Sequence, residues 1–415
     1  PPFFFHAHEG IRHSSTSRGL GDVYKRQLYA CAAALHFLGK DHQFKTDILS
    51  NQKNLILKGG GDADLSVKEI DSLALEVSKK YKDIDTLFID DSFLDSLNYG
   101  EGWMWDEGAW WYAAPISALS VNDNCIDFYV APGKKGNRAA INYFPKTSYI
   151  DFNNESITVQ DSVGSKLKID RNWISNKNNF HAYGEIIDTS DVDTLYRNIY
   201  DPSTFTGTIF RESLEKYGTR VKNISKKKTS KQRYKNISTH LSKPLLHSAV
   251  NLMNESDNLT AELFVKSIGA MDTIPGTWDT GLDSIKSFLA EKVLIDTANI
   301  RLADGSGVSR YNLTNSAQLN SLLKWMYNSE YKDDFISTLP GGGWKNSTLK
   351  KRLTNEGDLV RAKTGGLSGV RNLAGYIKSK KYGDVAFSIL MNGYTDYSSR
   401  YARVHDQIVK TIIYD

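Results

Sequence analysis

The sequence predicts an α/β protein in which helices surround a sheet and a strand-rich segment occupies the middle of the chain. Three patterns lead to this prediction. Apolar residues have helical spacing at 28–39 and again after Pro244. Buried strands follow near the C-terminus, at residues 360–366 and 385–392. Short runs at residues 126–187 alternate apolar and polar side chains, which is typical of an antiparallel sheet.

Length and composition indicate a globular protein of two or three domains. The chain has 415 residues, of which 40% are apolar and 11% aromatic, so it can bury a sizeable core. The net charge of +4 is small, and no basic helix or zinc-type spacing occurs, so nucleic-acid binding is not expected. Cys31 and Cys125 are too few for a disulfide scaffold, and their pairing stays open. No apolar run is long enough to span a membrane.

The first 27 residues have no helical or strand period and no signal-peptide pattern. Residues 18–27 resemble translated sequencing-adapter read-through, and the pattern changes abruptly at Leu28. A natural N-terminus without order is the alternative. We expect residues 1–27 to be foreign to the fold, so that the true N-terminus and any signal peptide are missing from this chain.

The elements after this segment can be assigned in order. Residues 28–39 form an Ala-rich buried helix, which suggests close packing at the centre of a helical domain. Residues 54–58 form a strand, and the glycine turn at 59–62 lacks the Gly-Lys-Ser/Thr of a phosphate loop. Residues 68–81 have helical spacing, and residues 86–91 form a strand that runs into acidic residues.

Two segments of unusual composition allow two interpretations each. Residues 103–112 hold five aromatic side chains, which suits a sugar-stacking platform, but a packed lid or interdomain surface is the favoured interpretation. Residues 222–235 carry seven basic residues and no acid. A solvated linker is favoured there over attraction to an anionic cell surface.

After Pro244 one helix ends at residues 254–258, and a second helix follows at 259–268. Ser256 and Asn258 place a hydroxyl and an amide in the tight turn between these helices. A Ser or Asp that caps the second helix explains the same residues without any chemistry. The remaining elements are a turn at 304–310, a helix at 318–327, a glycine loop at 339–343 and a closing helix at 400–413.

The strand at residues 360–366 contains Lys363-Thr364-Gly365. In a strand Lys363 and Gly365 face one way and Thr364 the other. The lysine can hold a carboxylate as a point charge, and the glycines let a ligand backbone lie close to the strand. An exposed edge strand with a chance Lys-Thr-Gly is the alternative.

Ser-x-Asn about a hundred residues before Lys-Thr-Gly is the spacing of the penicillin-recognising serine enzymes. The sequence resembles one branch of them, the D-alanyl-D-alanine carboxypeptidase/endopeptidase family of low-molecular-mass penicillin-binding proteins. The resemblance extends over nearly all of residues 28–415. The matching stretches are 28–39, 59–62, 90–91, 102–106, 113–119, 122–125, 256–258, 304–310 and 363–365.

The resemblance implies a penicillin-recognising serine transpeptidase-like domain, an antiparallel sheet with helices on both sides, interrupted by a sheet-rich inserted domain. On this basis residues 28–65 and 237–415 would form the catalytic domain, and residues 66–236 the inserted domain. The expected subdomains of the insertion are residues 66–150 with 206–236, and residues 151–205. Residues 1–27 would not be part of the fold.

In this family the first motif, Ser-x-x-Lys, carries the nucleophile and its base at the start of the helix that continues as residues 28–39. By register the Ser position falls on Tyr24 and the Lys position on Gln27. Lys25 is out of register and is not a substitute. The chain as written therefore lacks its nucleophile, although the natural protein is expected to have one, and we predict that this chain is inactive.

The resemblance implies catalytic roles for Ser256, Asn258 and Lys363. Ser256 would relay a proton to the leaving D-alanine nitrogen, and Asn258 would hydrogen-bond the side-chain amide of the substrate. Lys363 and Thr364 would hold the terminal carboxylate and tune the protons of the site. The backbone N–H of Gly366 would supply half of an oxyanion hole.

Further substrate-binding residues are implied by the same resemblance. They are Asp257, Gly365, Arg310, Ser368, Asp91 and Phe93. Arg310 and Ser368 would approach the stem peptide. Asp91 and Phe93 would come from the inserted domain to contact the amino end of its third residue. Asp91 could equally be a turn residue, and Arg310 a structural ion-pair partner.

The predicted function is that of a serine-type D-Ala-D-Ala carboxypeptidase/endopeptidase of the cell envelope, expected in the periplasm. It would cleave peptidoglycan stem peptides and cross-links through an acyl-enzyme, and β-lactam antibiotics would acylate it. No metal or organic cofactor is implied. One alternative is a β-lactamase or esterase of the same fold, against which the long insertion and the turn at 304–310 argue. The other is a non-catalytic peptidoglycan-binding protein, which a genuine segment 1–27 would support.

Overall fold

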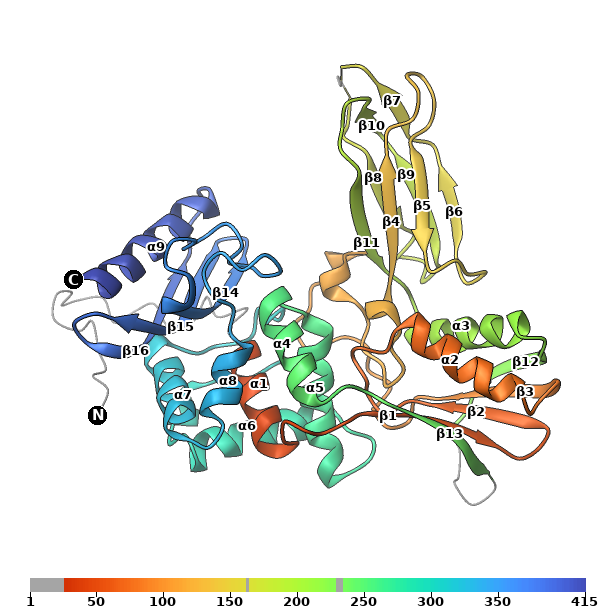
Figure 1. The fold of residues 1–415 in the computed structure, drawn as a ribbon, viewed down its shortest axis with the longest axis horizontal. Helices are drawn as coiled ribbons and strands as arrows, with labels where there is room; N and C mark the ends of the chain where they lie inside the picture. The colour runs from red at the N-terminus through yellow and green to blue at the C-terminus, as the bar shows by residue number, and fades with distance from the viewer. Residues whose placement is uncertain (1–25, 162–163, 229–233) are drawn as a thin grey trace. The chain divides into compact units, whose positions relative to one another are not determined.

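The computed structural model describes residues 26–161, 164–228 and 234–415 of the chain (Figure 1). These residues divide into two compact units. The first unit comprises residues 26–43, Gly100–Trp103 and Lys243–Asp415, and the second comprises Phe44–Tyr99 and Met104–Ser242. A sheet-rich segment therefore interrupts a domain of helices and one sheet, as the sequence predicted.

Helix α1 (Arg26–Phe37) lies at the centre of the first unit. Every residue from Arg26 to Leu35 is buried, because the small side chains of its alanine run let neighbouring helices approach from all sides. The helices that pack on it are α4 (Leu245–Glu255), α5 (Asn258–Asp272), α6 (Trp278–Glu291) and α8 (Lys332–Thr338).

Helix α5 is also buried on every side from Asn258 to Gly269. It packs most closely on α6 at Gly281, where a Cβ would lie 2.0 Å from the Val265 carbonyl oxygen. Only glycine allows this approach of the two backbones. The two buried helices α1 and α5 thus form a rigid base, and the Ser256 turn lies at the N-terminal end of α5.

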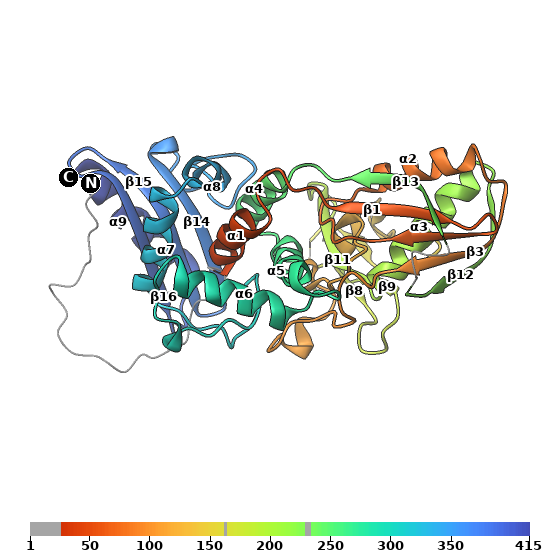
Figure 2. The ribbon, with the colours of Figure 1, turned by 90° about the horizontal axis from the view of Figure 1, so that it is seen from below.

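The sheet of the first unit is antiparallel, with strand order β14-β15-β16. Its strands are β14 (Val360–Leu367), β15 (Val370–Ser379) and β16 (Gly383–Asn392). Figure 2 shows α9 (Ser398–Tyr414) on one side of this sheet and α7 (Ser316–Asn328) on the other. Val409 and Ile413 of α9 pack in one apolar cluster with Val360 and Ala362 of β14. This order leaves β14, which carries Lys-Thr-Gly, at the edge of the sheet.

The second unit contains a mixed five-stranded sheet with strand order β12-β3-β2-β1-β13. The strands are β1 (Lys45–Ser50), β2 (Asn54–Lys58), β3 (Asp83–Asp90), β12 (Arg220–Lys226) and β13 (Lys235–Leu241). Helices α2 (Val67–Ser78) and α3 (Pro202–Lys216) cover one face (Figure 1). Ser66 and Glu69 form a capping box that fixes the start of α2.

The rest of the second unit consists of three small sheets, with strand orders β11-β4-β5, β6-β9-β8 and β10-β7. The strands are β4 (Cys125–Ala131), β5 (Ala140–Phe144), β6 (Asp151–Asn154), β7 (Ile157–Val159), β8 (Lys168–Arg171), β9 (Asn179–Tyr183), β10 (Glu185–Ile187) and β11 (Asp193–Asn198). Phe128 and Phe180 meet in the apolar core of this part, with ring centres 5.2 Å apart. The predicted antiparallel domain is present, with two parallel pairs, β6–β9 and β7–β10, in addition.

Several predicted boundaries differ from the structure. Residues 44–65 belong to the second unit, because β1 and β2 are inner strands of its five-stranded sheet. The predicted subdomain 151–205 begins earlier, since β4 and β5 pair with each other and β4 pairs with β11. The basic stretch 222–235 was predicted to be a linker, but β12 extends to Lys226 and pairs with β3.

Most of the N-terminal segment 1–27 lies outside the described residues. Its last two residues, Arg26 and Gln27, belong to α1 and are buried, so for them the expectation of no packed place is wrong. Cys31 and Cys125 are both buried, one in each unit, and neither forms a disulfide within the described residues. Within the part of the chain that the structure covers, no helix has the length and apolar character needed to cross a membrane.

Candidate active site

Ser256 lies in the turn between α4 and α5, with backbone angles φ 62 and ψ 43. This left-handed conformation is rare for residues other than glycine, and when it persists it is often found at functional sites. Asp257 caps α5, since its carboxylate accepts hydrogen bonds from the Leu259 and Thr260 N–H groups at 3.0 and 3.2 Å. The capping explanation therefore holds for Asp257, whereas the Ser256 hydroxyl makes a different contact.

Lys363 of β14 provides that contact. Its Nζ donates hydrogen bonds to Ser256 Oγ and, at 3.2 Å, to the Thr364 carbonyl oxygen. The predicted convergence of Ser256 and Lys363 is therefore confirmed. The Lys363 side chain is fully buried, and burial lowers the pKa of its amine to about 7, because the charged form loses its hydration. Near neutral pH this amine can both accept and donate a proton.

Gln27 is the residue that the predicted register aligns with the lysine of the first motif. It lies in the first turn of α1, is fully buried, and its Nε2 donates to Asn258 Oδ1 at 2.9 Å and to the Asp257 carbonyl oxygen at 3.4 Å. Its Oε1 is buried without a hydrogen-bond partner in the described part of the chain. A buried acceptor without a partner costs about 1–3 kcal/mol, and a lysine would bring donors only. Tyr24, at the serine position, lies outside the described residues.

Along the side of β14 that does not face β15, backbone N–H groups point away from the sheet. The Ala362 N–H donates to the Pro340 carbonyl oxygen, which lies outside the sheet, at 3.0 Å. Because the direction of N–H groups alternates along a strand, those of Thr364 and Gly366 point to the same outer side. A peptide ligand can therefore pair with β14 as an additional strand, with its carbonyl near the Gly366 N–H.

Arg310 and Ser368 lie together at the far end of β14. The exposed Arg310 directs its Nη1 to the Ser368 carbonyl oxygen at 3.5 Å, and Ser368 follows β14 in the turn to β15. The structure thus brings these two predicted residues together. Their contact with a stem peptide stays a prediction.

Asp304 organises the turn that carries Arg310. Its buried carboxylate accepts hydrogen bonds from the N–H groups of Gly307 and Ser309 at 2.8 and 2.6 Å. It also accepts from Trp103 Nε1 at 2.9 Å and Asn312 Nδ2 at 2.7 Å. Burial raises the pKa of the Asp304 carboxyl, whereas these hydrogen bonds lower it. Trp103 is therefore packed, whereas Trp105, Trp110 and Trp111 are exposed, so the favoured interpretation of the aromatic segment holds for Trp103 but not for the segment as a whole.

Glu262 of α5 supports the same turn from inside the unit, a role that was not among the predictions from the sequence. Its fully buried carboxylate accepts hydrogen bonds from the N–H groups of Gly305 and Ser306, both at 2.8 Å, and from Trp278 Nε1 at 2.7 Å. Burial, and after it the charge of Asp304, raises the pKa of the Glu262 carboxyl. Lys266, one turn later, lies 3.8 Å from the centre of the Trp278 ring. Two charged residues four positions apart within an otherwise buried helix are the signal that could have found this cluster.

Asp91 and Phe93 belong to the second unit. Asp91 accepts a hydrogen bond from Ser203 Oγ at 2.6 Å and forms an ion pair with Lys226 at 3.4 Å. Phe93 is half-buried in the turn after β3. Asp91 therefore has a structural partner in its own unit, and the approach of both residues to a substrate stays a prediction.

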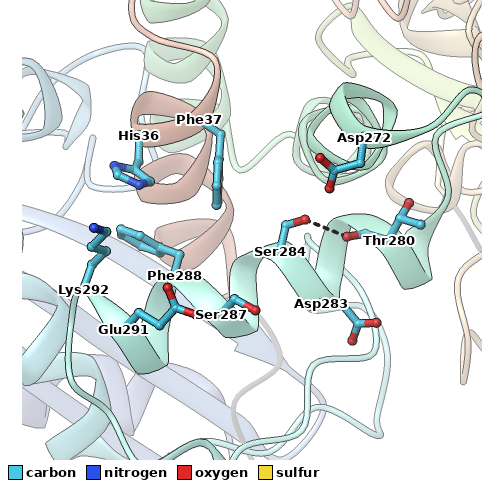
Figure 3. A pocket seen from close by; sticks show the side chains of 10 residues that line it. All are labelled: His36, Phe37, Asp272, Thr280, Asp283, Ser284, Ser287, Phe288, Glu291 and Lys292. Carbon is cyan, nitrogen blue, oxygen red and sulfur yellow. Dashed lines mark hydrogen bonds between the residues drawn. The ribbon is translucent and has the colours of Figure 1, made fainter.

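A separate cavity of about 480 Å³ lies between α1 and α6 (Figure 3). His36 stacks on Phe288 there, with ring centres 4.8 Å apart, and burial lowers the pKa of the imidazole. None of the predicted site residues lines this cavity. No cluster of His, Cys, Asp or Glu suited to a metal ion occurs among the residues for which the structure gives positions.

Comparisons with known proteins agree with this arrangement. The D-Ala-D-Ala carboxypeptidase 3 (S13) family model matches residues 25–412. A D-alanyl-D-alanine carboxypeptidase from an Actinomadura species is 31% identical over 396 residues, which cover 89% of this chain and 72% of the relative. The D-alanyl-D-alanine carboxypeptidase DacB of Haemophilus influenzae is 28% identical over 393 residues, 89% of this chain and 80% of the relative.

A solved structure agrees as well. The crystal structure of penicillin binding protein 4 from Haemophilus influenzae matches with a TM-score of 0.83 at 25% identity, covering 98% of this chain and 94% of that one. Its similarity extends through both compact units of the present chain. The chain belongs to the D-Ala-D-Ala carboxypeptidase 3 (S13) family.

Proposed function

We propose that this protein is a serine-type peptidase that removes the terminal D-alanine of peptidoglycan stem peptides and cleaves peptidoglycan cross-links, in both cases through an acyl-enzyme. β-Lactams would acylate the same site. The contact of the buried Lys363 amine with Ser256 carries this proposal, because it joins two sequence motifs 107 residues apart into one proton-transfer pair. The family membership supplies the class of substrate.

In the proposed reaction the substrate pairs with the edge of β14, so that the scissile carbonyl meets the Gly366 N–H. A serine hydroxyl at position 24 attacks this carbonyl, and an amine at position 27 accepts the hydroxyl proton. The C–N bond then breaks, and Lys363 delivers a proton through the Ser256 hydroxyl to the leaving nitrogen. Water later hydrolyses the ester.

This chain has Tyr24 and Gln27 at the two positions that the first step requires. The remaining side chains of the site are assembled, so we expect the chain to bind its substrate without being acylated. Peptidoglycan as substrate requires a location in the cell envelope, and we propose the periplasm.

A second candidate function is that of a non-catalytic peptidoglycan-binding protein. Gln27 favours it, since the amide is buried and hydrogen-bonded to Asn258 in the position of the catalytic amine. The orphan Oε1 of Gln27 argues against it, because a site adapted to glutamine would satisfy this acceptor. The acylation of a chain with the restored motif separates the two candidates.

Calorimetric titration with a peptide ending in D-Ala-D-Ala tests the proposed substrate class. The unmodified chain is expected to bind this peptide and to reject the same peptide ending in L-Ala-L-Ala. Lys363→Met is expected to weaken binding, whereas Lys350→Met, which removes an exposed lysine of the same unit, is expected to leave it unchanged. Equal binding of the two stereoisomers would contradict the proposed function.

A further inference from the structure

Arg371 of β15 lies directly opposite Gly366 of β14 in the antiparallel register. Residues opposite each other in neighbouring strands place their side chains on the same face. Gly366 has no side chain, and the Arg371 Nη1 lies 2.9 Å from the position that a Cβ on Gly366 would occupy. The guanidinium group therefore lies over the edge strand, next to the N–H proposed to bind the scissile carbonyl.

The Arg371 guanidinium forms no ion pair in residues 26–161, 164–228 and 234–415, although Asp406 lies near enough to act on its charge, and its Nε is buried without a hydrogen bond. Asp406, the nearby carboxylate on α9, is bound by Arg352 Nη2 at 2.8 Å. Asp396, which lines the same cavity, pairs with Arg400. A half-buried charge without a partner is costly, and such a group calls for an explanation.

The Tyr394 hydroxyl is a second unsatisfied group in the same place. It is buried without a hydrogen-bond partner in the described chain, while the Tyr394 ring stacks on Tyr401 with centres 3.8 Å apart. Arg371 and Tyr394 both line a cavity of about 740 Å³ at the turn between β14 and β15. The other residues that line it include Gly366, Leu367, Ser368, Gly369, Asp396 and Ser398.

We propose that Arg371, assisted by the Tyr394 hydroxyl, binds a carboxylate of the ligand that pairs with β14. The planar guanidinium fork matches the two oxygens of a carboxylate, and a phenol hydroxyl adds one further donor. This inference rests on the proposed function, because it concerns a peptide held at the edge of β14. Two sources of the carboxylate are possible, the C-terminus of the peptide and an acidic side chain nearer its N-terminus.

Arg371 can bind a carboxylate more strongly than Lys363 can, because the two side chains differ in charge near neutral pH. The Lys363 amine is partly neutral near pH 7, which suits proton transfer and leaves Lys363 only part of a charge with which to hold a carboxylate. An arginine stays charged throughout this range. Arg371 would therefore neutralise the ligand carboxylate while Lys363 moves protons with Ser256.

Calorimetric titration of the chain as given tests this proposal without turnover. The ligands are a peptide ending in D-Ala-D-Ala, its C-terminal amide, and a pair of such peptides with Glu or Gln upstream. Arg371→Met is expected to reduce affinity for the carboxylate-bearing ligand roughly ten- to hundredfold and to leave the matching amide almost unchanged. Arg371→Lys should fall between, because it keeps the charge and loses the fork.

Arg403→Met is the matched control, since it removes an exposed arginine of the same unit and should change neither affinity. Thermal unfolding of each variant checks that it is folded. If Arg371→Met weakens binding of the C-terminal acid more than that of its amide, the carboxylate is the terminal one. If it weakens binding of the Glu peptide more than that of the Gln peptide, the carboxylate is the upstream side chain. Equal losses for acids and amides would overturn the proposal and assign Arg371 a packing role only.

The same titration with N-acetyl-D-alanine and its amide separates this inference from the proposed function. If the longer peptides do not bind but the acid is preferred in an Arg371-dependent way, the carboxylate site stands and the proposed function fails. If the longer peptides bind with no dependence on Arg371, the proposed function stands and the carboxylate site is refuted. Failure of both the peptides and N-acetyl-D-alanine to bind would overturn both.

Discussion

Replacing Lys363 by methionine should change how the stability of the protein depends on pH. Methionine keeps an unbranched chain of similar length and removes the amine. The amine has its pKa lowered from 10.5 to about 7 by full burial. Between these two pH values the unfolded state binds a proton that the native state does not, so the free energy of unfolding of the unmodified protein rises with pH. Below about pH 7 both states bind the proton, and this slope disappears.

The magnitude follows from the size of the shift. One pKa unit corresponds to about 1.4 kcal/mol, so lowering the pH from 9 to 7 should cost the unmodified protein roughly 2 kcal/mol that the methionine variant does not lose. As the pH falls from 9 to 7, the free energy of unfolding of the Lys363→Met variant should therefore rise by roughly 2 kcal/mol relative to that of the unmodified chain. The comparison isolates one amine, because all other titrating groups are common to both proteins.

Urea unfolding at several pH values between 6 and 9 measures this difference. Lys350→Met serves as the control, because its side chain is exposed and its removal should give a difference that is flat with pH. A difference between the Lys363→Met variant and the unmodified chain that stays constant from pH 7 to 9 would refute the neutral-amine account. Proton transfer by Lys363 near neutral pH would then lack its basis.

Three further changes test the support of the site. Glu262→Ala leaves the Trp278 indole N–H and two backbone N–H groups unpaired, and urea unfolding should show a loss of roughly 3–5 kcal/mol, with a smaller loss for Glu262→Gln. Gly281→Ala forces a methyl group against the Val265 carbonyl oxygen and should lower the melting temperature by an amount equivalent to roughly 1–3 kcal/mol. Ser66→Ala removes the capping box of α2 and should cost about 1 kcal/mol, without any effect on peptide binding by calorimetry. A stable Glu262→Ala variant, or weaker peptide binding in Ser66→Ala, would contradict these assignments.

The central contact could be predicted from the sequence because motif order carries tertiary information. Ser256 and Lys363 are 107 residues apart, and no local pattern joins them. The resemblance of both motifs to one family, at the expected spacing, predicted their meeting. The positions of Tyr24 and Gln27 follow from the same register and stay predictions, and the structure places Gln27 beside Asn258.

The boundary between the units could not be predicted from local patterns. The strand at residues 54–58 was identified, but the pattern of a strand does not say which sheet it joins. Its partners, β1 and β3, assign it to the five-stranded sheet of the second unit. The prediction of a linker in the basic stretch is wrong for the same reason. Residues up to Lys226 form a strand only because they pair with β3, which the local pattern does not show.

The roles of buried polar residues could not be predicted from the sequence either. Glu262 and Lys266 are two charged residues in an otherwise buried helix, but the sequence does not show that Glu262 binds N–H groups of a turn more than forty residues away. Arg371 has no sequence signal at all, because its position matters only through the glycine opposite it in register. Such roles arise from the packing of distant segments, which sequence periodicity does not record.

The central claim is that this chain contains an acyl-enzyme site in which Tyr24 and Gln27 stand at the positions of the nucleophile and its base. Mass spectrometry after incubation with labelled penicillin tests it most directly. The unmodified chain, Tyr24→Ser alone and Gln27→Lys alone should form little or no covalent adduct, because the hydroxyl and the amine act as a unit. The variant with both substitutions should form the adduct, and adding Lys363→Ala to it should weaken acylation. An adduct on the unmodified chain, or none on the correctly folded double variant, would contradict the account.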